Sequence, residues 1–485
     1  MAEKFCNFVN GEWVGADGKA TFGSINPADT RDVIGEFASS QVEDVRKAIR
    51  AAHDALQGWK SLSGWARGEF LRKAADILES RLEEVAQAMV RENGKTIGEA
   101  KGETARGVAL LRFYAAEGVR SRGEVIPSTN PRTFVYTTRA PLGVVSVITP
   151  WNFPIAIPIW KIAPALVYGN TVVFKPASIT PHCGVLVTRV LEQAGIPRGV
   201  FNLVTGGGRA VGEELVRDDR VHGVTFTGSN TVGRQIASWA AERGVKFQLE
   251  MGGKNPIIAL PDCDLEQATT LTLRGAFGYA GQKCTATSRA IIHTSIYEAF
   301  SRKLVEKCKA LKIGAGKDES TLMPPVVSDE QHKSILDAIR KGREKGKLLC
   351  GGGVPEGEAF KHGYFIEPTI FGDVPPGSYL AQEEIFGPVL ALMQARDFDD
   401  AIRLANDTRY GLSASIFTRD LNAVQDFAER IEAGVVKVNS ETAGIEPQVP
   451  FGGMKESSSH SREQGRAALE FFTSVKSVYM DRAGQ

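Results

Sequence analysis

The alternation of strand-like and helix-like segments between residues 142 and 252 constrains the fold more than any other feature of the sequence. Apolar, β-branched runs lie at 143–149, 171–175, 201–204, 221–227 and 246–250, and helical segments between them start near residues 155, 181, 208 and 229. Runs of this kind are typical of a parallel sheet that helices cover on both faces. We therefore predict an α/β fold in which ligands bind at the carboxyl ends of the strands.

Two glycine turns follow strands of this array. One is Thr205-Gly-Gly-Gly208, and the other is Thr227-Gly-Ser-Asn-Thr-Val-Gly233 at the start of a helical segment. A helix N-terminus in such a position attracts phosphate. Neither turn is the GxGxxG fingerprint of dinucleotide-binding proteins. A dinucleotide site and two ordinary turns stay open as alternatives at this point.

The segments before this array predict strands and then helices. Residues 5–36 indicate a short antiparallel lead-in, because strand-like pieces alternate with turns. Ser40-Gln-Val-Glu43 reads as a capping box, and helical spacing recurs over 64–79, 82–93 and 97–118. Residues 123–139 read as strand, turn and strand.

The second half of the chain repeats the alternation less regularly. Strands are expected near 255–260, 290–294, 387–394, 412–417 and 434–439, and helices near 265–277, 296–310, 328–345, 397–406 and 420–432. This pattern predicts a second α/β domain. The alternating run Thr473–Met480 predicts a terminal strand without a partner in its own chain, and such a strand invites pairing with another subunit.

Composition argues against several classes of function. The 58 Lys and Arg residues balance 57 Asp and Glu residues in a chain of 485, so no basic surface for nucleic acid is expected. No apolar run approaches the roughly 18 residues of a membrane span, and the N-terminus lacks a signal-peptide core. The six cysteines lie far apart without CxxC or metal-ligand spacing, so we expect neither disulfides nor a metal site. We therefore expect a cytoplasmic protein without nucleic-acid or membrane partners.

Cys284 is the first candidate nucleophile. It lies between the helix-like run Leu265–Phe277 and the strand-like run Ala290–Thr294. A free thiol with a pKa near ~8.5 is only a few per cent thiolate at neutral pH, and the neighbouring Lys283 would favour the thiolate. Alone, however, a cysteine is more often a small buried apolar residue.

Seven stretches decide between these interpretations. They are Thr149-Pro-Trp-Asn-Phe-Pro154, Phe174-Lys-Pro-Ala-Ser178, Phe226-Thr-Gly-Ser229, Leu249-Glu-Met-Gly-Gly-Lys-Asn-Pro256, Gly281-Gln-Lys-Cys284, Glu383-Glu-Ile-Phe-Gly-Pro388 and Pro450-Phe-Gly-Gly-Met-Lys455. In this order and at these separations they resemble the aldehyde dehydrogenase superfamily over essentially the whole chain.

The resemblance implies three structural parts. Residues 1–119 and 142–252 would form a Rossmann-like dinucleotide-binding domain, and residues 253–452 an α/β catalytic domain. Residues 120–141 and 453–485 would form a small β oligomerisation arm and a C-terminal tail. The arm, from roughly 120 to 140, is expected to join the terminal strand at about 472–481 of a neighbouring subunit. We therefore expect a homodimer or a homotetramer.

The resemblance also implies the catalytic roles. Cys284 is expected to attack the aldehyde, because the aldehyde carbon must become electron-rich before it releases hydride. The side-chain amide of Asn152 and the backbone N–H of Cys284 would hold the oxyanion of the thiohemiacetal. Glu250 would be the general base that hydrolyses the resulting thioester, with Lys161 assisting proton transfer or orienting the site. Relatives that pass the acyl group to coenzyme A lack this glutamate, so Glu250 implies release of a free carboxylic acid.

For the cofactor, the resemblance places Lys175 and Ser178 at the adenosine ribose and Ser229 at the pyrophosphate. It places Glu384 at the nicotinamide ribose and Phe386 against the nicotinamide. The other expected cofactor-binding residues are Pro150 and Trp151, which shape the adenosine side, and Ile148, Thr149, Gly208, Thr227, Gly228, Val232 and Leu249.

Ser178 departs from the pattern of strongly NAD-selective members. They usually have a glutamate at this position, which would repel a 2′-phosphate. The serine removes that repulsion, and Lys175 supplies a cation. We therefore expect that NADP is accepted, either in place of NAD or alongside it.

The aldehyde tunnel of the family is expected to be lined here by Phe153, Trp160, Ile445 and Phe451, which are all apolar or aromatic. Members that act on succinate semialdehyde usually carry an arginine six residues before the nucleophile, and this chain has Gly278 there. Only Arg274, Arg289 and the Lys455 region remain as partners for a substrate carboxylate.

Two segments, Ile155–Lys161 and Pro450–Gly465, look most like the branch of 2-oxoglutarate semialdehyde (2,5-dioxopentanoate) dehydrogenases. We therefore expect this substrate. One alternative is a broad-specificity enzyme for apolar or aromatic aldehydes. The other is a catalytically silent, cofactor-binding structural protein, against which the intact Cys284, Glu250 and Asn152 argue.

Overall fold

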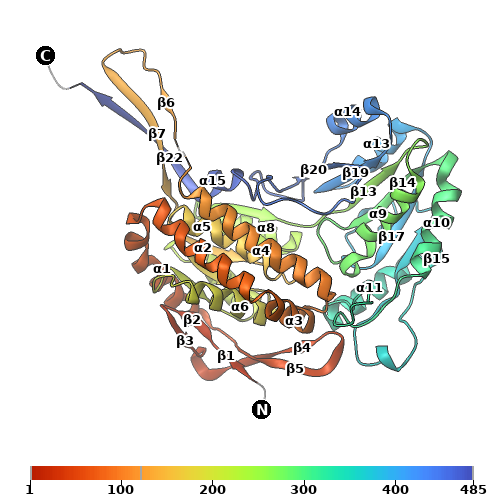
Figure 1. Cartoon of the computed structure of the whole chain (residues 1–485), viewed down its shortest axis with the longest axis horizontal. Coiled ribbons are helices and arrows are strands. Elements are labelled where there is room, and N and C mark those ends of the chain that lie inside the picture. The colour runs from red at the N-terminus through yellow and green to blue at the C-terminus, as the bar shows by residue number, and fades with distance from the viewer. Residues whose placement is uncertain (1–2, 121–122, 483–485) are drawn as a thin grey trace.

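A computed structural model describes residues 3–120 and 123–482, apart from the side chains of residues 209 and 210. The chain forms two α/β lobes, each built on a seven-stranded sheet, and a narrow β arm that projects from the first lobe (Figure 1). This architecture confirms the predicted fold class, whereas the domain boundaries stay predictions. Over the two described ranges, no helix is both long enough and apolar enough to cross a membrane.

The first sheet has the strand order β12-β11-β8-β9-β10-β2-β3. Its five parallel strands match the predicted ones, and they are β8 (Val144–Ile148), β9 (Thr171–Lys175), β10 (Phe201–Leu203), β11 (Val221–Thr227) and β12 (Lys246–Glu250). β2 (Asn7–Val9) and β3 (Glu12–Val14) extend one edge as an antiparallel hairpin. Asn10 and Gly11 form its two-residue turn with positive φ at both positions, as such tight hairpins require.

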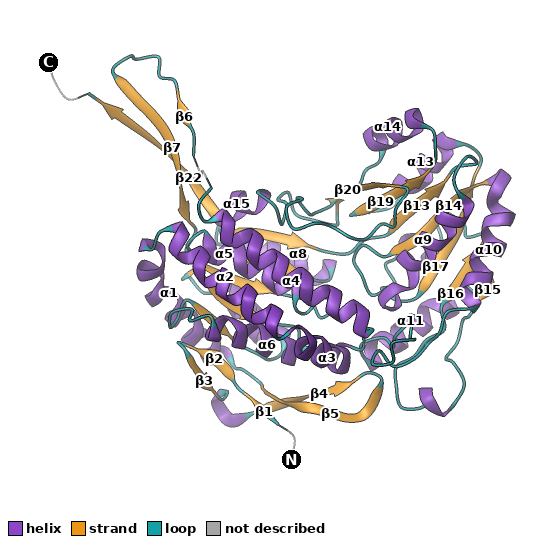
Figure 2. Ribbon diagram, in the orientation of Figure 1, coloured by secondary structure: helices purple, strands orange, loops and turns teal. Residues whose placement is uncertain are grey.

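Helices cover both faces of this sheet, as predicted (Figure 2). One face packs against α1 (Val42–Ser61), α7 (Gly208–Arg217) and α8 (Asn230–Glu242). The other face packs against a layer made of α2 (Gly64–Ser80), α3 (Leu82–Asn93), α4 (Ile97–Glu117), α5 (Ala156–Val167) and α6 (Pro181–Gln193). The sheet therefore lies in the middle of the lobe.

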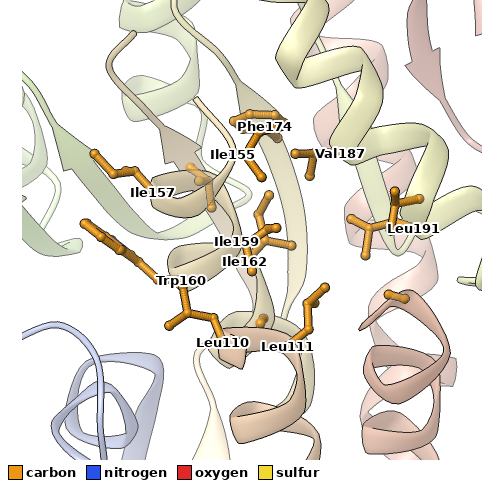
Figure 3. Close-up of a cluster of buried hydrophobic side chains, with 14 of the residues drawn as sticks. Leu110, Leu111, Ile155, Ile157, Ile159, Trp160, Ile162, Phe174, Val187 and Leu191 are labelled. Atoms are coloured by element: carbon orange, nitrogen blue, oxygen red, sulfur yellow. The ribbon is translucent and has the colours of Figure 1, made fainter. Parts of the chain in front are cut away.

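Helix α5 is the centre of that second layer. All of its residues are buried, which suits a helix that is apolar on every side. Figure 3 shows Ile159 and Ile162 of α5 beside Leu111 of α4 and Leu191 of α6. This packing fixes the loop that precedes α5, where the sequence analysis placed Asn152.

The second sheet has the order β15-β16-β17-β14-β13-β19-β20. Its strands are β15 (Lys347–Cys350), β16 (Thr369–Gly372), β17 (Val389–Ala395), β14 (Thr287–His293), β13 (Asn255–Ala259), β19 (Ser413–Phe417) and β20 (Val435–Val438). All neighbouring pairs are parallel except β15 with β16. The helices of this lobe are α9 (Leu265–Phe277), α10 (Tyr297–Lys309), α11 (Asp329–Gly342), α12 (Tyr379–Gln382), α13 (Phe398–Asn406) and α14 (Leu421–Arg430). β15, β16 and α12, each four residues long, were not predicted from the sequence.

Smaller elements complete the fold. β1 (Lys4–Phe5) and β4 (Thr21–Asn26) flank β5 (Asp29–Ala38) in a three-stranded sheet, and β18 (Tyr410–Gly411) pairs with β21 (Met454–Lys455). Short 3-10 turns are η1 (Asp17–Lys19), η2 (Gly278–Gly281), η3 (Thr294–Ile296) and η4 (Glu358–Phe360).

The predicted capping box at the start of α1 is wrong by one residue. The N-cap is Gln41, whose backbone N–H donates to Asp44 Oδ2 at 2.9 Å. Ser40 is not available as a cap, because its side chain exchanges hydrogen bonds with the side chain of Asn7, at 2.9 Å and 3.1 Å. A contact with a distant strand thus overrides the local pattern.

The predicted partner of the terminal strand also needs correction. β22 (Thr473–Asp481) pairs along its whole length with β7 (Thr133–Pro141) of the same chain, and β6 (Val125–Ile126) lies on the other side of β7. The terminal strand therefore has a partner within its own chain. The reason is proximity: α15 (Ala467–Phe472) ends where Thr473 stands opposite Pro141, beside the free edge of β7. Figure 1 shows these strands as the projecting arm.

A buried ion pair fixes the start of α5. Lys95 Nζ donates to Glu103 Oε2, and both side chains are 1% exposed. Glu103 Oε1 accepts hydrogen bonds from the backbone N–H groups of Ile155 at 2.8 Å and Ala156 at 3.1 Å. Lys95 Nζ also donates to the carbonyl oxygen of Asn152 at 3.0 Å. The pair therefore ties α4 to the loop that carries Asn152.

We expect Glu103→Gln to lower the free energy of unfolding by about 3–5 kcal/mol, because it leaves the buried ammonium of Lys95 without a counter-charge. Urea denaturation would measure the change. The matched control is Glu83→Gln, which removes the carboxylate of the exposed pair with Lys101 and should leave stability unchanged within error. Equal effects of the two substitutions would contradict this account of the buried pair.

Candidate active site

A cleft of about 190 Å³ opens between the two lobes, where β8, β11 and β12 reach their carboxyl ends. It is lined by Pro150, Trp151, Asn152, Thr227, Gly228, Ser229, Met251, Gly252, Cys284, Gln331, Glu384 and Phe386. All of these except Met251, Gly252 and Gln331 were assigned to the site from the sequence. The cleft lies where parallel sheets place their ligands.

The turn before Cys284 has an unusual backbone. Tyr279 (φ 57°) and Ala280 (φ 49°) adopt the left-handed conformation, and Gly281 (φ 68°) follows them. Such non-glycine residues cost of order 1–3 kcal/mol each. The surroundings hold the turn, since the Tyr279 hydroxyl donates to Asn93 Oδ1 at 2.5 Å. Asn255 Nδ2 donates to the carbonyl oxygen of Cys284 at 2.8 Å and fixes the backbone at the nucleophile.

The thiol of Cys284 is neutral at physiological pH in this environment. Burial is the main cause that raises its pKa to about 12, and the nearby carboxylates of Glu384 and Glu250 contribute to this rise. The ammonium of Lys283, expected to favour the thiolate, is directed elsewhere. It lies 4.0 Å from Glu441 Oε2 and 3.4 Å from the point where a Cβ on Gly278 would stand. A base must therefore take the proton of the thiol during reaction.

Asn152 lies beside Cys284 in the cleft and is 2% exposed. Its Nδ2 donates to the carbonyl oxygen of Gln282 at 3.1 Å, which leaves its second amide N–H for a ligand. The loop is held on its other side by Asn93, whose Nδ2 donates to the carbonyl oxygen of Trp151 at 2.8 Å. Asn152 is therefore placed to donate to a negatively charged oxygen next to the thiol.

Glu250 ends β12 and is 1% exposed. Burial raises the pKa of its carboxyl well above the usual range, and the neighbouring Glu463 raises it further. The Ser458 hydroxyl donates to Glu250 Oε2 at 2.5 Å and itself accepts from the N–H of Gly453 at 2.6 Å. The other oxygen, Oε1, has no hydrogen-bond partner among the described residues. The carboxyl is thus anchored by one oxygen and free at the other.

Lys161 and Glu463 form a second buried ion pair next to Glu250. Lys161 Nζ donates to Glu463 Oε1 and to Thr225 Oγ1, the latter at 2.9 Å, and both charged side chains are almost fully buried. Lys161 lowers the pKa of Glu250 and Glu463 raises it. Lys161 was predicted from the sequence, whereas Glu463 and Ser458 were not.

Glu384 and Phe386 close the cleft from the second lobe. Burial raises the pKa of Glu384 to about 7, and its Oε1 accepts from the N–H of Gly253 at 2.9 Å. A Cβ on Gly252 would stand 2.1 Å from Glu384 Oε2, so only glycine permits this approach. Phe386 meets Trp151 edge-on, with ring centroids 5.3 Å apart. Trp151 therefore contacts the residue assigned to the nicotinamide, whereas the sequence analysis placed it on the adenosine side.

Several residues assigned to the cofactor lie outside the lining of the cleft. They lie at or just after the carboxyl ends of β8, β9 and β12 or in the first turns of α7 and α8, and they are Ile148, Thr149, Lys175, Ser178, Gly208, Val232 and Leu249. Burial lowers the pKa of Lys175 to about 8, and Ser178 Oγ donates to the carbonyl oxygen of Gly206 at 2.8 Å. Of the two glycine turns, only 227–233 reaches the cleft, and there Ser229 is the N-cap of α8.

These residues fit a dinucleotide. The N-terminus of α8 faces the cleft and suits a phosphate. The buried Thr227 Oγ1 and Asn152 Oδ1 have no hydrogen-bond partner within the described part of the chain and are available to a ligand. Glu384 offers a carboxylate for ribose hydroxyl groups.

Four of the five residues predicted to bind substrate belong to, or pack against, one apolar cluster that Cys284 also contacts. Phe153, Cys284 and Ile445 are partly buried and pack against one apolar cluster that also contains Trp160 and Phe451. The rings of Trp160 and Phe451 lie 5.6 Å apart. Gly278 stands at the end of α9, next to the ammonium of Lys283.

The site residues that were not predicted from the sequence differ in how strongly the sequence pointed to them. Gly252 was part of a quoted motif, and its role became clear only from its distance to Glu384. Ser458 and Glu463 lie in the quoted segment Pro450–Gly465, but nothing in a single sequence directs them towards Glu250. Gln331 is one polar residue in an amphipathic helix, and we find no sequence signal for it.

Comparisons with known proteins agree with this geometry. A family model described as "Aldehyde dehydrogenase family" matches residues 13–478. The alpha-ketoglutaric semialdehyde dehydrogenase of Bacillus subtilis is 52% identical over 98% of both chains. The 2,5-dioxopentanoate dehydrogenase of Saccharolobus solfataricus is 43% identical over 96% of this chain and 98% of its own. The crystal structure of betaine aldehyde dehydrogenase from Staphylococcus aureus in complex with NAD⁺ superimposes with a TM-score of 0.97 at 34% identity, covering 100% of this chain and 96% of that one.

Proposed function

The chain belongs to the aldehyde dehydrogenase family and oxidises an aldehyde with NAD(P)⁺, and from this premise we propose that its substrate is 2-oxoglutarate semialdehyde, released as 2-oxoglutarate. The observation that carries the proposed mechanism is the position of Cys284. Its thiol shares one cleft with Asn152 and Glu384, and it lies within electrostatic reach of the buried Glu250.

The first step is addition of the Cys284 sulfur to the aldehyde carbon. The thiol loses its proton, the new C–S bond forms, and the carbonyl electron pair moves to oxygen. Asn152 Nδ2 and the backbone N–H of Cys284 stabilise that oxyanion, and one such donor is worth ~2.7–4 kcal/mol. The free oxygen of Glu250 is suited to take the thiol proton, because the raised pKa makes this carboxyl a stronger base than usual.

Oxidised nicotinamide supplies the hydride acceptor when it is bound, and the thiohemiacetal on Cys284 then becomes a thioester. Glu250, which has by then released the thiol proton to solvent, takes a proton from the water that attacks the thioester carbon, and it later returns this proton to the Cys284 sulfur. The C–S bond breaks, the carboxylic acid leaves, and the thiol is restored. Ser458 holds Glu250 in place during this step, and the pair of Lys161 and Glu463 sets the local charge.

The substrate assignment rests on the relatives. The relatives from Bacillus subtilis and Saccharolobus solfataricus are named for 2-oxoglutarate semialdehyde, which is 2,5-dioxopentanoate, and they match almost the whole chain. The alternative is broad specificity for apolar or aromatic aldehydes. The packing of Phe153, Trp160 and Phe451 favours that alternative, because the tunnel walls are aromatic.

We propose further that NADP⁺ is accepted as well as NAD⁺. Ser178 carries no charge that would repel a 2′-phosphate, and its hydroxyl is anchored on Gly206. Lys175 is the nearest cation along the chain. Its ammonium is buried, which lowers its pKa and makes an added negative charge favourable.

The arm supports a proposal that the protein forms homo-oligomers. Exposed apolar side chains gather on it, and they are Val125, Ile126, Phe134, Val475, Tyr479 and Met480. Both outer strands of its three-stranded sheet, β22 and β6, have a free edge within the described chain. A second subunit would cover this apolar surface and pair with an edge.

Ser458→Ala tests the anchoring of Glu250. Loss of the hydrogen bond destabilises the carboxylate and raises the pKa of Glu250 further. Since the base acts in its ionised form, the acid limb of the kcat profile should move to higher pH, and kcat at pH 7 should fall roughly tenfold. The control is Ser461→Ala, which removes a buried hydroxyl that has no hydrogen-bond partner among the described residues. An acid limb that stays in place in Ser458→Ala, or moves equally in both variants, would show that Ser458 does not act on Glu250.

Relative kcat/KM values test the substrate. We expect 2,5-dioxopentanoate to exceed succinate semialdehyde and benzaldehyde, because the relatives named for it share most of the chain. Each aldehyde would be measured with NAD⁺ and with NADP⁺, following the reduced cofactor by absorbance. A benzaldehyde preference of tenfold or more refutes the substrate, and activity with NAD⁺ alone refutes the cofactor proposal.

A further inference from the structure

Lys283 lies where a charged substrate would need a cation. The position six residues before the nucleophile is Gly278, and a Cβ there would stand 3.4 Å from Lys283 Nζ. We propose that the ammonium of Lys283 occupies the space left by this glycine and binds the carboxylate of the substrate. The inference rests on the proposed function, because it names the group that recognises the acid end of 2,5-dioxopentanoate.

The ammonium is buried without a close partner. The Lys283 side chain is 11% exposed, and within residues 3–120 and 123–482 its nearest ion-pair partner is Glu441 Oε2 at 4.0 Å. That distance is at the limit of an ion pair and beyond a hydrogen bond. Burial lowers the pKa of Lys283, so its charged form gains from an added anion.

The acidic groups around Lys283 have other partners. Glu441 pairs with Arg274 at 3.3 Å. Glu99, whose Oε1 is 3.8 Å from the same Cβ position on Gly278, accepts from the N–H of Thr96 at the start of α4. A helix N-terminus compensates negative charge. Among these charged groups, the ammonium of Lys283 is therefore the one that remains available to bind an incoming carboxylate.

The three cations that the sequence suggested as partners of the substrate carboxylate, Arg289, Lys455 and Arg274, are already engaged elsewhere. Arg289 is fully buried and donates to the carbonyl oxygens of Lys254, Leu404 and Ala405. Lys455 Nζ donates to the carbonyl oxygens of Asn406 and Thr408. The Arg274 side chain is 72% exposed and already faces Glu441.

Arg106 is the strongest competitor. Its guanidinium lies 5.8 Å from the ring centre of Trp160, on the same side of the site. It already donates to the carbonyl oxygen of Ile445 and, at 2.9 Å, to Gln464 Oε1. These two hydrogen bonds to neutral acceptors hold the guanidinium in place. Lys283 directly precedes Cys284 in the chain. This proximity suits a substrate whose aldehyde and carboxylate carbons are only four bonds apart.

The test compares two aldehydes of equal length. 2,5-Dioxopentanoate carries the carboxylate, and pentanal does not. Lys283→Gln is expected to lower kcat/KM for 2,5-dioxopentanoate roughly 10- to 100-fold, mainly through KM, and to leave pentanal within about threefold. Arg274→Gln is the matched control, since it removes the other cation beside Glu441 from an exposed position, and it should change neither value appreciably.

A rescue variant separates recognition from a structural role. Gly278 has φ −55°, which any residue can adopt. In the double variant Gly278→Arg with Lys283→Gln, an arginine would enter the space that Lys283 leaves. We expect it to recover most of the lost preference for 2,5-dioxopentanoate over pentanal.

The outcomes distinguish this inference from the proposed function. A parent enzyme without preference for 2,5-dioxopentanoate over pentanal refutes the substrate itself. A parent with the preference that Lys283→Gln retains, while Arg106→Gln loses it, assigns the carboxylate to Arg106 and overturns the inference. An equal loss for both aldehydes in Lys283→Gln also overturns it, because Lys283 would then act on Cys284 or on folding.

Discussion

Desolvation of ionisable side chains between the two lobes governs the chemistry of this protein. Burial raises the pKa of Cys284 to about 12 and also raises that of Glu250, so both groups hold their protons more tightly than in water. A carboxylate whose pKa is raised accepts protons more readily than an exposed one. The same burial strengthens hydrogen bonds from Asn152 to a developing oxyanion, since little water competes for it. The site therefore gains its reactivity from the packing of the lobes.

The scaffold holds these groups through contacts between distant segments. Residues 457–459 lie alongside β12, where the N–H of Met251 donates to the carbonyl oxygen of Ser457 at 2.7 Å. This contact positions the hydroxyl of Ser458 to donate a hydrogen bond to Glu250. On the other side, the ion pair of Lys95 and Glu103 fixes the loop of Asn152. Loss of either support would allow Glu250 or Asn152 to shift relative to Cys284, and a misplacement of about 1 Å can cost roughly 100-fold in rate.

The regular parts of this structure could be predicted from the sequence, and the long-range contacts could not. The five parallel strands and their helices have clear periods, so their positions match. The cap of α1 was misplaced because Ser40 bonds to Asn7, and the partner of β22 was wrong because alternation reveals a strand but not its neighbour. Glu463 was missed for the same reason, since only the fold brings it to Lys161, 302 residues earlier. The quoted motifs located Cys284, Asn152 and Glu384 in one cleft.

The central claim is that Cys284 forms the acyl intermediate and that this intermediate is not released without Glu250. Rapid mixing of Glu250→Gln with cofactor and 2,5-dioxopentanoate tests it most directly. The account predicts a burst of about one equivalent of reduced cofactor per site, formed more slowly than in the parent, then near arrest, with the acyl group on Cys284 by peptide mass spectrometry. Steady turnover at the parent rate, or an acyl group on another residue, would contradict it.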